Sequence, residues 1–172
     1  MSHGVYHTVL HDTRLDGKAH HIGRVVAVNE SYTLDRVVTL TKKLGMATDS
    51  SGQLIILCHG STASLQLSKD YLTRKNVAKT APWHGLFDEI YLYSCEIAPL
   101  AFGENPHKHH QFCRDLARHT NSTVYASDTT QWFNTSFFFN EIDFGKWEGH
   151  VYAFPPSGGG CKQVVIKAHD MS

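Results

Sequence analysis

The stretch LIILCHG, residues 54–60, constrains the fold more than any other part of the sequence. In it, four aliphatic residues lead without interruption into Cys58, His59 and Gly60. Continuous aliphatic runs of this length are typical of strands that are buried on both faces of a parallel sheet. Neighbouring parallel strands need long crossover connections, which are usually helices. The stretch therefore predicts an α/β fold in which an imidazole follows directly after a core strand.

Segments with strand patterns and segments with helix patterns alternate along the chain. Short apolar runs predict core strands at 24–28, 54–58, 90–94 and 123–127, with a small strand extension at 64–67. Amphipathic stretches predict helices at 31–45, 73–83 and 107–120. The residues expected to face inward from the first and third helices are Leu34, Val37, Val38, Thr41, Leu44, Phe112, Cys113 and Leu116. The alternation predicts a mainly parallel central sheet with helices on both faces and right-handed crossovers.

The last third of the chain has a different pattern, which predicts a β-hairpin. The stretches WEGHVYAF and KQVVIKA are separated by PPSGGG, a sequence typical of a tight turn. The chain as a whole, 1–172, is expected to form one domain with its core at about 24–132 and C-terminal strands at about 136–168. The aromatic residues Trp132, Phe133 and Phe137 to Phe139 fit either a core layer or an exposed binding patch. We expect a core layer, because large apolar side chains are usually buried.

Charge and length exclude several classes of function. The 172 residues contain 16 Lys and Arg against 16 Asp and Glu, so no net field favours nucleic acid or an anionic membrane as a partner. The chain has no basic segment followed by an apolar one at its start, and no apolar run of membrane-spanning length. We therefore expect a cytoplasmic protein, or one exported by a route that needs no signal peptide.

The four cysteines, Cys58, Cys95, Cys113 and Cys161, lie far apart in the sequence and form no CxxC pair. This spacing fits reduced thiols better than a disulfide framework or a thiolate zinc site. Cys58 and Cys113 are expected in the core because they belong to apolar patterns. Cys161 is interpreted as structural or incidental, since it lies in a glycine-rich turn.

Histidine is abundant, and His107, His109 and His110 form the densest cluster of potential metal ligands. No carboxylate or cysteine completes a ligand spacing typical of a metal site there. We interpret the cluster as the solvated start of a helix, and expect neither a metal nor a cofactor.

Two of the predicted core strands end in residues that carry chemistry. His59 follows the strand at 54–58, and Cys95 follows the strand at 90–94. In open α/β sheets, reactive groups gather beyond the carboxyl ends of the parallel strands, so an imidazole and a thiol are expected at the same edge. Such a pair provides a nucleophile and a proton carrier. The backbone amides of Gly60 and Cys95 are candidates for an oxyanion hole. Taken alone, Cys95 also fits a buried, inert thiol.

This combination resembles the caspase-like, or clan CD, cysteine peptidases, and is closest to the bacterial CHAT and gingipain-like branch. The resemblance covers about residues 24–132 and lies in ILCHG…LQL…NVAKTAPWHGLFDEIYLYSCE, with the histidine before the cysteine. It implies a caspase-like three-layer sandwich with a small β-hairpin extension. It also implies a cysteine endopeptidase that acts on a protein or peptide substrate, with His59 as general acid/base and Cys95 as nucleophile. A homo-oligomer or a regulatory protein partner is a further implication.

The resemblance also implies where a substrate would bind. The loop after the next strand, Ser127 to Trp132, would pair with the substrate, with Asp128 in that loop and Trp132 walling a subsite. Asn29 and Glu30 would contribute the opposite wall. Family members that cleave after basic residues have an aspartate two residues before the cysteine, where this chain has Tyr93. Asp128 or Glu96 would have to replace it.

Two other classes of function remain open at this point. One is a catalytically inactive binding or scaffold module on the same fold. The other is a thiol acyltransferase or deamidase, such as an effector that modifies another protein. One scaffold hosts many activities, so the fold does not decide among these classes.

Overall fold

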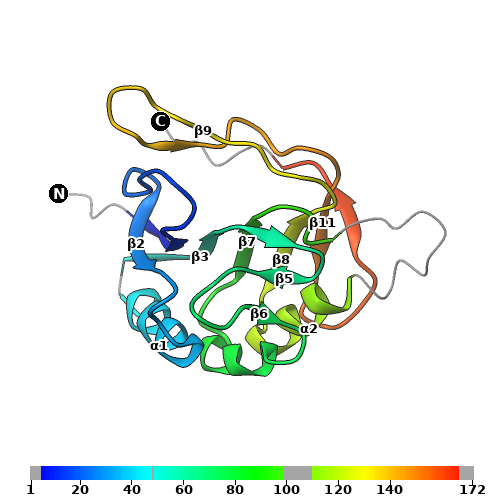
Figure 1. Cartoon of the computed structure of the whole chain (residues 1–172). Coiled ribbons are helices and arrows are strands. Elements are labelled where there is room, and N and C mark those ends of the chain that lie inside the picture. The colour runs from blue at the N-terminus through cyan, green and yellow to red at the C-terminus, as the bar shows by residue number, and fades with distance from the viewer. Residues whose placement is uncertain (1–4, 48, 99–109, 167–172) are drawn as a thin grey trace.

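A seven-stranded sheet forms the centre of the protein. The structure, a computed structural model, describes residues 5–47, 49–98 and 110–166. The strands follow the order β12-β11-β8-β7-β3-β1-β2 (Figure 1). Their bounds are β1 (Tyr6–Asp12), β2 (Gly23–Val28), β3 (Ser50–Leu57), β7 (Glu89–Tyr93), β8 (Thr123–Ser127), β11 (Val151–Phe154) and β12 (Lys162–Val164). The strands β2, β1, β3, β7 and β8 pair in parallel. The strand β11 pairs antiparallel with both β8 and β12. A mainly parallel α/β sheet is therefore confirmed.

Within the described residues, the helices cover only one face of the sheet, so the prediction of helices on both faces is wrong. The helices are α1 (Leu34–Gly45), the 3-10 helix η1 (Val77–Trp83) and α2 (Gln111–Thr120), and all three contribute to one hydrophobic cluster with the sheet. The opposite face is covered by residues of the connecting segments 15–22 and 142–147.

The order of the strands explains this distribution. The chain moves one way across the sheet from β1 to β2, and the other way from β2 to β3, β7 and β8. Right-handed crossovers that run in opposite directions lie on opposite faces. The connections that carry helices all run in the second direction, and the β1–β2 connection, residues 13–22, contains no helix.

The helix α1 forms as its sequence predicts. The side chain of Thr33 accepts a hydrogen bond from Arg36 N and caps the first turn, while Lys42 and Lys43 lie in the last turn. Of its predicted inward residues, Leu34, Val37, Val38 and Thr41 are buried, whereas Leu44 is half-buried. At the end of the helix, an added Cβ on Gly45 would lie 2.5 Å from Phe87 Cζ, so only glycine fits there.

Other predicted elements are confirmed with shifted bounds. The strands predicted at 24–28, 54–58, 90–94 and 123–127 correspond to β2, β3, β7 and β8, although β3 begins earlier. The C-terminal hairpin is present as β11 and β12. The third helix begins at Gln111, and positions 107–109 of that prediction lie outside the described residues. The segment predicted as a helix at 73–83 forms only the short η1, with Pro82 inside it.

Two small sheets flank the central one. After β3, the chain forms β4 (Gly60–Ser61), β5 (Ser64–Leu65) and β6 (Leu72–Thr73), which includes the predicted extension at 64–67. On the loop-covered side, β9 (Asn134–Thr135) pairs with β10 (Ile142–Asp143) (Figure 1). None of the helices in the described ranges has the length and apolar character that a membrane span requires.

Most of the aromatic group at 132–139 is exposed, so the expected core layer is wrong for it. Phe137, Phe138 and Phe139 are 94%, 86% and 67% exposed, and Trp132 is 73% exposed. The three phenylalanines lie in the turn between β9 and β10, beyond the paired residues. Only Phe133 is half-buried, with its ring centroid 5.4 Å from that of Phe144.

Trp83 is the largest side chain in the helix-covered core, which predicts a large effect of its removal. Its indole Nε1 donates to Val38 O at 3.0 Å, and its ring packs edge-on against Phe87. We expect Trp83→Ala to lower the free energy of unfolding by about 3–5 kcal/mol, measured by chemical denaturation. The matched control Trp132→Ala changes an exposed indole and should stay within about 0.5 kcal/mol of the parent. Equal effects of the two changes would contradict this packing.

Candidate active site at the carboxyl edge of the sheet

His59 and Cys95 lie beyond the ends of two adjacent parallel strands. The register of β3 against β7 ends with Leu57 opposite Tyr93. Two residues further along from each of these positions are His59 and Cys95. The intervening pair is joined as well, because Ser94 Oγ donates to Cys58 O at 2.9 Å. The two candidate residues therefore occupy equivalent positions at one edge of the sheet.

This edge is also where the chain connections diverge. After β1 the chain passes over the loop-covered face, and after β3 it continues to β4 and then to the helix-covered face. Crevices at the carboxyl ends of parallel strands form where neighbouring strands send their connections to opposite faces. The gap between the ends of β1 and β3 meets this condition, and His59 lies directly beside it.

The imidazole of His59 is exposed and oriented by the turn after β1. Its Nε2 lies 3.2 Å from the carbonyl oxygen of Arg14. Because a carbonyl oxygen only accepts hydrogen bonds, Nε2 carries the hydrogen, and Nδ1 of the neutral ring is left with its lone pair. The contact therefore fixes the tautomer in which Nδ1 acts as the base.

A partly buried ion pair holds Arg14 in position. Asp12 is fully buried at the end of β1, and its carboxylate accepts bonds from Arg14 Nε at 2.8 Å and Nη2 at 2.6 Å. Nη2 also donates to Ser68 O at 2.9 Å, which ties this turn to the segment between β5 and β6. The hydrogen bond with Asp12 raises the pKa of Arg14, so the guanidinium stays charged. This pair is not among the residues predicted from the sequence, although the spacing Asp-x-Arg is compatible with it.

Cys95 is half-buried at the end of β7 and is covered by the loop that follows β8. Its Sγ lies 3.8 Å from Gln131 O. The next residue, Glu96, has a positive φ of 48°, and its N–H donates to Thr129 O at 3.1 Å. The thiol is therefore neither sealed in the core nor fully open to solvent.

Gly60 is required for the close approach of the two strand ends. A Cβ on this residue would collide with Ser94 Oγ, and would lie 2.7 Å from Ile97 Cδ1 and 3.0 Å from Cys95 O. Gln66 N donates to His59 O, so Gly60 and Leu65 form a non-hydrogen-bonded pair in the antiparallel ladder. The N–H of Gly60 consequently points away from β5.

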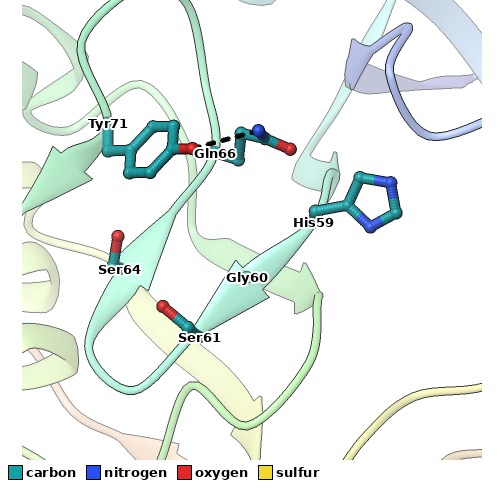
Figure 2. Close-up of a pocket in the computed structure, with 6 residues that line it drawn as sticks. All are labelled: His59, Gly60, Ser61, Ser64, Gln66 and Tyr71. Carbon is teal, nitrogen blue, oxygen red and sulfur yellow. Dashed lines mark hydrogen bonds between the residues drawn. The ribbon is translucent and has the colours of Figure 1, made fainter.

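A polar pocket lies on the β4–β5 side of His59. It has a volume of about 200 Å³ and is lined by His59, Gly60, Ser61, Ser64, Gln66 and Tyr71. Gln66 Nε2 donates to the Tyr71 hydroxyl at 3.1 Å, which closes one side of the pocket. In the view of Figure 2, the His59 ring points away from Ser61 and Ser64. The pocket therefore lies beside the imidazole rather than beneath it.

Two of the predicted substrate-binding residues support the loop itself. Ser127 is buried, and its hydroxyl donates to Glu148 O at 2.6 Å. The carboxylate of Asp128 accepts from His150 N at 2.9 Å and lies 3.1 Å from His150 Nδ1. Both side chains are therefore engaged in joining the loop after β8 to the segment that precedes β11.

The other predicted substrate-binding residues differ in their distance from the two strand ends. Glu96 is exposed beside Cys95, and its Oε1 accepts from Thr130 Oγ1 at 3.1 Å. Trp132 is exposed and follows Gln131, the residue that contacts the Cys95 thiol. Asn29 follows β2, which is separated from β3 by β1, and its side chain caps the turn by accepting from Ser31 N at 2.9 Å. Of these three residues, Asn29 therefore lies farthest along the sheet from the ends of β3 and β7.

The remaining core thiols are chemically quiet, as the sequence predicted. Burial raises the pKa of Cys58 to about 12 and also raises that of Cys113, so both are protonated at neutral pH. His107 and His109 of the histidine cluster lie outside the described residues, whereas His110 is buried rather than solvated. In the part of the chain that the structure describes, no group of three or more His, Cys, Asp or Glu side chains is placed to hold a metal ion.

Comparison with known proteins assigns the chain to a family. The search of curated proteins gives no match to the chain. A family described as Domain of unknown function (DUF8616) matches residues 35–152, which include all of α1 except Leu34, the central strands β3, β7 and β8, and both His59 and Cys95. The chain therefore belongs to the family of proteins that contain this domain.

Proposed function

We propose that the chain is a cysteine endopeptidase of the caspase-like type, with His59 as general acid/base and Cys95 as nucleophile. One observation carries this proposal: the in-register pairing of β3 with β7, which places the two residues at equivalent positions beyond adjacent strand ends. Both lie outside the sealed core, since His59 is exposed and Cys95 is half-buried. The contact of His59 with Arg14 O supports the assignment, because a base held by a third group is characteristic of activated nucleophiles.

The chemistry would proceed through an acyl-enzyme. Nδ1 of His59 takes the thiol proton, and Sγ of Cys95 attacks the carbonyl carbon of the scissile peptide bond. The backbone N–H groups of Gly60 and Cys95 stabilise the negative oxygen that forms. The bond to the amine breaks as His59 returns the proton to the leaving nitrogen. A water molecule, deprotonated by His59, then hydrolyses the thioester and restores the free thiol.

The loop after β8 is the best-placed substrate wall. It passes over Cys95 at Gln131 and then presents Trp132, whose exposed indole offers apolar surface to a bound peptide. Tyr93, which stands two residues before Cys95, is buried against Phe144 and Trp147 and offers no charge to a basic side chain. A preference for basic residues would therefore depend on Glu96, the exposed acid beside the nucleophile.

A second candidate function is a catalytically inactive binding module on the same fold. The contact between Cys95 Sγ and Gln131 O favours it, because a thiol that donates to a backbone carbonyl does not donate to an imidazole at the same time. The two candidates differ in the reactivity of the thiol, which the following experiment measures.

An active pair predicts that Cys95 is alkylated before the core thiols. At neutral pH, we expect iodoacetamide to label Cys95 at least about tenfold faster than Cys58 or Cys113, measured by peptide mass mapping over time. His59→Ala should lower the rate at Cys95 about tenfold, because the base and the imidazolium are lost. The matched control His84→Ala removes an exposed imidazole elsewhere and should leave the rate unchanged. If labelling of Cys95 does not respond to His59→Ala, the inactive module is the better description.

Peptidase activity predicts new termini in a peptide library. Incubation of the chain with the library, followed by mass spectrometry, should give cleavage products that disappear with Cys95→Ala and persist with Cys161→Ser. Acylated or deamidated peptides in place of cleaved ones would instead identify a thiol acyltransferase or deamidase. The preferred residue at the cleavage site follows from the same data.

The packing at Gly60 predicts a large loss of turnover when a methyl group is added. Gly60→Ala forces apart the ends of β3 and β7, so the proposed oxyanion donors move, and we expect turnover on a cleaved library peptide to fall about a hundredfold. Gly160→Ala is the matched control, because a Cβ there meets nothing within 4 Å. Full turnover of the Gly60→Ala chain would remove this residue from the proposed site.

A further inference from the structure

A second cysteine–histidine pair lies outside the proposed active site. Cys161 immediately precedes β12, and its Sγ is 3.5 Å from Nδ1 of His110, the residue at the start of α2. The imidazole packs against Tyr152 and Phe154 of β11, with ring centroids 5.4 Å and 5.3 Å away. The pair therefore lies between α2 and the antiparallel edge of the sheet.

The imidazole of His110 is oriented to accept a proton from Cys161. His110 is buried, and its Nε2 lies 3.3 Å from Ala98 O. A carbonyl oxygen only accepts, so Nε2 carries the hydrogen, and Nδ1 of the neutral ring presents its lone pair to the sulfur. The thiol consequently donates to Nδ1, and transfer of this proton would leave a thiolate beside an imidazolium. A nucleophile next to a base that is held by a third group is the geometry of an activated thiol.

The surroundings of Cys161 leave it accessible. The residue is half-buried, and the preceding Gly158 and Gly160 are exposed with open space around their Cα positions. Besides His110, the titratable groups Cys113 and Tyr152 interact with Cys161, and burial raises the pKa of both, so they are neutral at pH 7. Neither adds a negative charge that would oppose a thiolate.

We propose that Cys161 is a modification site for small disulfides, with His110 as its base. In this step His110 Nδ1 takes the thiol proton, and the Cys161 sulfur attacks one sulfur of the reagent. A bond forms between these two sulfurs while the disulfide bond of the reagent breaks. The departing thiolate takes the proton from His110, so one disulfide and one thiol give one mixed disulfide and one thiol. The open space around the glycine turn leaves room for a small reagent beside Cys161.

The test measures mixed-disulfide formation at Cys161 with hydroxyethyl disulfide at pH 7. The chain carries Cys95→Ser, so that the proposed active-site thiol does not contribute, and occupancy is read by peptide mass mapping. We expect Cys161 to react about tenfold faster in the folded chain than in the same chain unfolded in denaturant. His110→Gln, which retains hydrogen-bonding groups, should reduce the folded rate to the unfolded one. Cys161→Ser should show no adduct in this region.

The pH dependence of the unmutated pair tests the proposal even if His110→Gln does not fold. An activated thiol keeps most of its rate between pH 8 and pH 6.5, whereas an ordinary thiol with a pKa of about 8.5 loses nearly all of it. A folded rate no greater than the unfolded rate, with the steep profile of an ordinary thiol, would overturn the proposal. Because Cys95 is absent from the tested chain, neither outcome bears on the proposed peptidase function.

Discussion

The in-register pairing of β3 with β7 is the constraint on which the candidate site depends. Buried residues on both strands fix the register, because a shift by one position would turn each core side chain to the other face of the sheet and disrupt its close packing there. The same register carries beyond the strands, where Ser94 bonds to Cys58 O and Gly60 approaches the backbone of Cys95. The relative position of His59 and Cys95 is thus set by the core and not by the surrounding loops.

Much of the fold could be predicted because the core strands have simple patterns. LIIL and IYLY are uniformly apolar, and α1 and β8 also follow their expected periodicity, whereas β2 is an edge strand in which only Val28 is buried. The strand β1 was missed although it lies between β2 and β3, because YHTVLHD mixes polar and apolar residues. Its polar carboxyl end is stabilised by contacts that no periodicity reveals: His11 Nε2 bonds to Leu15 O, and Asp12 pairs with Arg14.

The exposed phenylalanines show a limit of a different kind. Three consecutive aromatic residues ordinarily indicate burial, yet Phe137 to Phe139 lie in a turn because the pairing of β9 with β10 ends at Thr135 and Ile142. A two-residue strand gives too little pattern to be read from sequence. The missed strand β1 also hid part of the candidate site, since Arg14, whose carbonyl orients His59, lies in the turn that follows it. Cys161 was interpreted as structural for a related reason, because its partner His110 is 51 positions away.

The unequal covering of the two sheet faces has a consequence for how the edge at His59 responds to a ligand. One side is backed by η1, which packs against both α1 and α2, whereas the other is closed by largely irregular segments. Irregular segments open locally more readily than packed helices, since they contain fewer protected backbone hydrogen bonds. The boundary between the helix-covered face and the loop-covered face, which opens more easily, therefore runs along the ends of β1 and β3. A ligand bound at this edge would displace the irregular segments, while the paired strands keep the spacing of His59 and Cys95.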